Sequence, residues 1–165
     1  MTRGARGAPP LQPRGAPPLQ PFGLRLHHDG RWSHEGQPIR NRRLREHFDR
    51  HVVYLPDERK YVVTLRHFRG EIEVEEAAFF VRAFEPRDAA LSLSDRSIEV
   101  LDPATLSISP LDGALLCRVK RDLAPQGLPA RFAHGAHAEL MHAVEEGEDG
   151  LVLRAGGALH PLPDL

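Results

Sequence analysis

The alternation of apolar and polar side chains predicts short strands along most of this chain. In Phe22–Leu26, apolar residues alternate with Gly23 and Arg25, as in a half-buried strand. Later segments with alternation or short apolar runs are also predicted to be strands: 31–34, 52–55, 61–66, 71–75, 78–84, 91–93, 98–101, 106–108, 114–120, 151–154 and 158–160. Ala78–Phe84 is apolar almost throughout, so we expect it in the middle of a sheet. Asp29-Gly30 predicts a hairpin. The connections are short, which predicts mostly antiparallel pairing.

Two segments have helical periodicity. Asn41 is a candidate N-cap for a helix over Arg42–His51. Its apolar stripe is expected to pack on a sheet and comprises Leu44, His47, Phe48 and His51. A second amphipathic helix is predicted from Pro129 to about Glu146, with Gly147 as its C-terminal cap. The predicted fold class is therefore α+β, with mostly antiparallel sheet in two small lobes and two amphipathic helices.

The chain is predicted to consist of a tail and two lobes. Residues 6–13 and 14–21 are the same proline-rich octad, so residues 1–21 are expected to form a disordered, extended tail. Its Pro-Leu-Gln-Pro segments suit an aromatic groove, although a disordered leader or a misplaced start codon is the plainer interpretation. Pro86-Arg87-Asp88 interrupts the strand pattern, which places the lobes at 22–86 and 87–165.

Composition excludes several classes of protein. The net charge of −1 lacks the basic excess that nucleic-acid binding needs, so no nucleic-acid partner is expected. The apolar runs are too short to span a membrane, and the N-terminus lacks a secretory signal. With a single cysteine, Cys117, no internal disulfide can form, which agrees with a soluble cytoplasmic protein. Arginine supplies all but two of the 22 basic residues, which suggests a GC-rich bacterial genome.

Several motifs in the first half occur in the order found in a known family. They are Asp29-Gly30-Arg31-Trp32, His34-Glu35-Gly36, Pro38-Ile39, Leu44, Phe48, Tyr61-Val62-Val63-Thr64, Ile72-Glu73-Val74-Glu75 and Phe79. In this respect the chain resembles the bacterial family called domain of unknown function 1285, over about Leu24–Val81. The resemblance implies a soluble bacterial protein in two parts and implies no activity. One departure is that Thr64 is followed by Leu65-Arg66-His67-Phe68, where the family favours a proline and a Glu-Lys pair.

Histidine pairs raise the possibility of a metal site. His47 and His51 are four residues apart on the first predicted helix, a spacing that zinc ligands use. His134 and His137 are three apart on the second. Neither pair has an identifiable third ligand, so packing against the sheet is the preferred interpretation, and no cofactor or metal is predicted.

Other residues are candidates for catalysis or binding. His34 and Glu35 together have the groups of an acid–base pair, although a turn at Glu35-Gly36 is the preferred interpretation. Cys117 is expected in the core, with a Cys-His nucleophile as the alternative. The candidate binding residues lie in the family-like segments or on the basic first helix, and they are Trp32, Arg43, Thr64, Glu73 and Glu75.

The absence of a complete catalytic motif favours a binding or regulatory protein. We expect a groove between the lobes to hold a small molecule or a protein, with oligomeric state left open. The alternative is a hydrolase-like or metal-dependent enzyme that uses His and Glu residues. An assembly role through edge strands is a third possibility.

Overall fold

The structure is a computed structural model that describes residues 20–66 and 68–165. Nearly all of the predicted tail lies outside the described residues. The first strand, β1, begins at Gln20, two residues earlier than the sequence pattern predicts. No helix of the described part is long and apolar enough to cross a membrane.

The described residues form an α+β fold rich in strands, as predicted. The helices are α1 (Arg42–His51), the short 3-10 helix η1 (Pro103–Thr105) and α2 (His134–His142). The strands are β1 (Gln20–Leu26), β2 (Trp32–His34), β3 (Gln37–Pro38), β4 (Val52–Leu55), β5 (Lys60–Leu65), β6 (Phe68–Val74), β7 (Phe79–Glu85), β8 (Ala90–Leu93), β9 (Ile98–Val100), β10 (Ser107–Ile108), β11 (Leu115–Val119), β12 (Leu128–Phe132), β13 (Val144–Gly147), β14 (Gly150–Ala155) and β15 (Ala158–Pro161).

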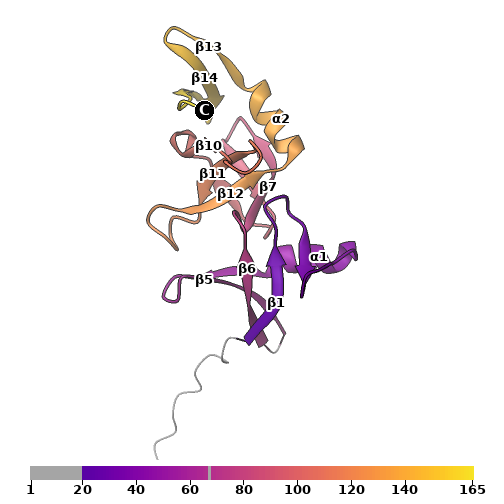
Figure 1. Ribbon diagram of the computed structural model, residues 1–165. Coiled ribbons are helices and arrows are strands. Elements are labelled where there is room, and N and C mark those ends of the chain that lie inside the picture. The colour runs from indigo at the N-terminus through magenta and orange to yellow at the C-terminus, as the bar shows by residue number, and fades with distance from the viewer. Residues whose placement is uncertain (1–19, 67) are drawn as a thin grey trace, which may run out of the picture.

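Two six-stranded sheets with the same strand order follow one another along the chain. The first has the order β3-β2-β1-β6-β5-β4, and the second, read from its other edge, has the equivalent order β9-β8-β7-β12-β11-β10. In each sheet, the strand that comes first in the sequence pairs in parallel with the strand that comes last, at the centre of the sheet: β1 with β6, and β7 with β12. The other described pairs are antiparallel. A third sheet of β13, β14 and β15 follows, so the molecule is elongated (Figure 1). The topology therefore repeats, although the sequence of the folded part shows no such repeat.

The chain passes from the first sheet to the second between β6 and β7. β7 lies between β12 and β8, which confirms that the apolar segment 78–84 is a central strand. The change of sheet at 75–78 precedes the predicted lobe boundary at 86/87. The division into two lobes remains a prediction.

The first helix has the predicted bounds but a different buried face. Asn41 caps it, because its Oδ1 accepts a hydrogen bond from the Leu44 amide at 3.1 Å. Of the predicted apolar stripe only Phe48 is buried, while Leu44 and His47 are exposed. Asp49 is buried beside Phe48 instead, since its carboxylate contacts other parts of the chain. The expectation that the whole stripe packs on the sheet is wrong.

The prediction of one long second helix is also wrong. Leu128–Phe132 forms β12, in which Leu128, Ala130 and Phe132 are buried and Pro129 and Arg131 are less so. Pairing with β11 and β7 thus outweighs the helical pattern. At the other end α2 stops at His142, and Gly147 lies in β13 opposite Gly150. The hairpin with β14 supplies the hydrogen bonds that a longer helix would have made.

The second sheet curls so that β9 approaches the end of β11, which is not its neighbour. The Lys120 ammonium lies 2.7 Å from Asp95 Oδ2 and 5.2 Å from the centre of the Phe79 ring. The Lys120 amide donates to Glu99 Oε1 at 2.8 Å. The Lys120 side chain is 13% exposed, so the curled sheet holds a shielded charge that is neutralised by its neighbours.

Candidate functional site

A polar groove lies between α1 on the first sheet and the parallel pair β7 and β12 of the second sheet. Its volume is about 440 Å³. We call it the arginine groove, because four of its charged wall residues are arginines. The charged residues are Asp29 of the β1–β2 turn, Arg42, Arg45, Glu46 and Asp49 of α1, Arg82 of β7 and Arg131 of β12. The β1–β2 turn closes one side, with Gly30 against the Phe80 ring. Gly30 has φ +89°, a conformation that glycine adopts readily, so this turn can approach the second sheet closely.

The wall of the groove is fixed by a buried hydrogen-bonded group. Trp32 is 1% exposed, and its Nε1–H donates to Asp49 Oδ1 at 2.8 Å. Arg82 Nη2 donates to the other oxygen, Oδ2, at 2.8 Å. Burial raises the pKa of Asp49 above its ordinary value, and the bonds from Trp32 and Arg82 oppose that shift. Asp49 thus connects α1 to Trp32 of the first sheet and to Arg82 of the second sheet, and it fixes the orientation of the Arg82 guanidinium.

The remaining arginines of the groove have unequal partners. Arg42 Nε donates to Glu46 Oε1 at 2.8 Å, and this bond lowers the pKa of Glu46. Arg131 makes a two-point contact with Asp112, with N–O distances of 2.7 and 3.0 Å. Arg45 differs from both, because its Nε is buried and has no hydrogen-bond partner in the described part of the chain. The groove therefore contains one guanidinium whose inner donor is unused.

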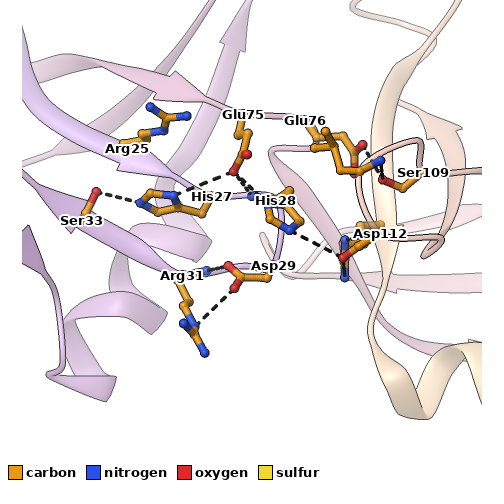
Figure 2. Close-up of polar contacts among 12 residues, drawn as sticks. Arg25, His27, His28, Asp29, Arg31, Ser33, Glu75, Glu76, Ser109 and Asp112 are labelled. Atoms are coloured by element: carbon orange, nitrogen blue, oxygen red, sulfur yellow. Dashed lines mark hydrogen bonds and ion pairs between the residues drawn. The ribbon is translucent and has the colours of Figure 1, made fainter. Parts of the chain in front are cut away.

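A second polar cluster joins the two sheets beside the groove (Figure 2). The His28 ring lies between two carboxylates, with Nδ1 2.9 Å from Glu75 Oε2 and Nε2 3.6 Å from Asp112 Oδ2. The bond to Glu75 raises the pKa of His28, and the contact with Arg131 lowers the pKa of Asp112 to about 2. Asp112 thus contacts both His28 and a guanidinium of the groove.

We expect His28 to titrate above its ordinary pKa of 6.5. A raised pKa in the folded chain means that the contribution of His28 to stability is fully present below about pH 6.5 and is lost as the pH rises through the folded pKa. A titration of the ring resonances by NMR measures this. In Glu75→Gln the pKa should fall towards 6.5, whereas in Glu73→Gln, a change on the exposed part of β6, it should stay raised. Equal values in all three proteins would contradict the assignment.

The residues predicted to bind or react lie in several places outside the arginine groove. His34 and Glu35 are exposed around the β2–β3 turn, where Glu35 has φ +48°. Arg43 is exposed on α1. Glu73 is exposed on β6, with its Oε2 4.0 Å from Arg25 Nη1. Thr64 Oγ1 donates to the His51 carbonyl at 3.4 Å. Of the predicted binding and catalytic residues, Trp32 contributes to the groove through Asp49, and Glu75 belongs to the neighbouring His28 cluster.

The histidine pairs and the cysteine occupy different settings. His47 and His51 stack with ring centres 4.2 Å apart, and His51 Nδ1 lies 2.6 Å from the His47 carbonyl oxygen. His134 lines the arginine groove at the start of α2. Within residues 20–66 and 68–165, no three His, Cys, Asp or Glu side chains form a group that could hold a metal. Cys117 is in the core as predicted, and burial raises its pKa to about 12, which disfavours the thiolate of a nucleophile.

Among the residues that line the groove, His134 alone was a predicted site residue, although the sequence holds one further signal. The α1 residues that line it, Arg42, Arg45, Glu46 and Asp49, follow the spacing i, i+3, i+4, i+7 and form one polar stripe. A continuous stripe of charges on a short helix usually faces solvent, so the pattern alone does not indicate a groove. Nothing in the local sequence indicates that β7 and β12 lie opposite that stripe.

Two solved structures are similar to this chain. One is a DUF1285 family protein from Silicibacter pomeroyi DSS-3, with a TM-score of 0.61 and 21% identity over 88% of this chain and 82% of that chain. The other is a DUF1285 family protein from Shewanella baltica OS155, with a TM-score of 0.49 and 12% identity over 74% of this chain and 91% of that chain. No protein-family model and no curated protein matches the chain. The likeness to the Silicibacter protein confirms, for the fold, the predicted resemblance to the domain of unknown function 1285 family. It assigns no activity.

Proposed function

We propose that this chain is a small-ligand-binding module and that the arginine groove is its binding site. The observation that carries the proposal is a groove of about 440 Å³ lined by four arginines, one of which, Arg45, has no side-chain hydrogen bond or ion pair within the described residues. Guanidinium donors that the chain leaves unpaired are available to a molecule bound in the groove. The volume lies in the range of about 300–1,000 Å³ that is common for ligand sites.

Binding explains this groove better than catalysis does. Both oxygens of Asp49 accept hydrogen bonds, and Glu46 is paired with Arg42. Carboxylates held in this way orient arginines and are poorly placed to accept a proton from a substrate. His34 and Glu35, the predicted acid–base pair, do not line the groove.

The test uses a change of shape without a change of charge. The full-length chain is incubated with the small-molecule fraction of a bacterial extract, below about 1 kDa, a limit that covers ligands fitting such pockets. It is then examined by native mass spectrometry. We expect a non-covalent adduct on the wild type and its loss in Ala133→Trp, since Ala133 lines the groove. Ala138→Trp, at an exposed position of α2, is the matched control and should keep the adduct. No adduct, or an adduct equally present in Ala133→Trp, would overturn the proposal.

A further inference from the structure

Hydrogen-bond donors exceed acceptors in the arginine groove. A guanidinium carries five N–H donors and no acceptor. Contacts with carboxylates use one nitrogen of Arg42, one of Arg82 and two of Arg131. The Arg45 side chain makes no hydrogen bond or ion pair among the contacts of the described residues, although its charge acts on Asp49. Most of the donor capacity in the groove is therefore free for an acceptor that the chain does not provide.

The carboxylates of the groove are already occupied. Asp49 uses one oxygen for Trp32 and the other for Arg82, and Asp29 accepts from the Arg31 amide at 3.1 Å. Four arginines face three carboxylates along the walls, so the lining has a formal excess of positive charge. A cation would be repelled by the guanidinium groups, and a neutral molecule would be a weaker partner for the Arg45 guanidinium than an anion.

We infer that the ligand of the arginine groove is a small anion that carries a carboxylate or phosphate group and pairs with Arg45. This inference rests on the proposed function and adds the chemical class of the ligand. Guanidinium groups bind carboxylate and phosphate oxygens through parallel N–H bonds, which favours these two anions over a spherical ion. Arg82 is half exposed, and only one of its nitrogens contacts Asp49, so it can provide a second point of contact.

The sources of the anion are distinguished by calorimetric titration of the full chain. The probes are sodium pyrophosphate as the phosphate source, sodium succinate as the carboxylate source, succinamide as a neutral analogue of succinate, and putrescine as a cation. Ionic strength is held at about 0.15 M, because exposed charges are screened by salt. We expect pyrophosphate or succinate to bind, and succinamide and putrescine to bind at least tenfold more weakly.

Two variants with the same charge change locate the anion. Arg45→Met removes the groove guanidinium and keeps a long side chain, and it should weaken anion binding at least tenfold. Arg43→Met changes an exposed arginine of the same helix outside the groove, and its affinity should stay within twofold of the wild type. Equal weakening by both variants would show a non-specific charge effect and overturn the inference.

The outcomes separate this inference from the proposed function. An extract adduct that is lost in Ala133→Trp and proves to be neutral or cationic would overturn the anion class and leave the groove as the binding site. Failure of pyrophosphate and succinate to bind, with that adduct present, would also overturn the class inferred here. If neither pyrophosphate nor succinate binds and no extract adduct forms, both proposals are overturned.

Discussion

Replacing Trp32 by alanine is expected to lower the free energy of unfolding by about 3–5 kcal/mol, the usual cost of removing a large buried aromatic side chain. Trp32 is 1% exposed, and its ring centre lies 5.4 Å from that of Phe48. The change leaves a cavity between β2 and α1 and removes a donor from Asp49. Urea unfolding followed by far-ultraviolet circular dichroism measures the loss, because the chain has no other tryptophan for fluorescence.

Trp32→Phe is the control for this prediction. Phenylalanine keeps most of the apolar contact with Phe48 and loses the hydrogen bond to Asp49, so its cost should lie clearly below that of alanine. A loss under about 1 kcal/mol for Trp32→Ala would mean that the residue is not the packing centre of the joint between α1 and β2. Equal losses for both variants would mean that the hydrogen bond, and not the volume, dominates.

Replacing Asp49 by alanine is expected to cost about 1–3 kcal/mol, the range for leaving a buried polar partner unsatisfied. The Trp32 N–H would lose its acceptor in the core, whereas Arg82 is exposed enough to be hydrated again. Glu46→Ala is the matched control on the same helix. It removes the exposed contact with Arg42 and should cost clearly less than Asp49→Ala.

The cost of Asp49→Ala should also depend on pH. Burial raises the folded pKa of Asp49 above 3.8, so its contribution to stability is fully present below that value and is lost as the pH rises through the folded pKa. The difference between wild type and variant is therefore expected to be larger near about pH 4 than near about pH 7. Unfolding curves at both pH values measure it. A larger difference at neutral pH would show that the ionised form is the one the fold stabilises.

Local signals in the sequence predicted the elements whose causes are local. The Asn41 cap and the periodicity after it gave the bounds of α1, and Asp29-Gly30 gave the first hairpin, in which the Gly30 amide donates to the His27 carbonyl at 3.0 Å. The segment Pro129–Glu146 failed because three short elements share a pattern that also fits one helix. There the choice depends on pairing with β7, which lies far away in the sequence, and with the neighbouring strands β11 and β14.

The candidate site depended on non-local contacts and could not be predicted in the same way. Arg82 and Arg131 stand among apolar strand residues, and their partners Asp49 and Asp112 are 33 and 19 positions away. The family-like residues instead directed attention to His34 and Glu35, which serve the β2–β3 turn. The parallel pairing of β7 with β12 is what brings the two arginines to one wall, and short-range patterns do not encode it.

The central claim, that the arginine groove binds a small anion through Arg45, is tested most directly by NMR of the arginine Nε–Hε groups. The Arg45 resonance is assigned by its absence from the spectrum of Arg45→Met. On titration with pyrophosphate or succinate, we predict a saturable shift of the Arg45 signal and little change at the exposed Arg43. Unchanged Arg45, or equal linear shifts of all arginine signals with added salt, would contradict the account.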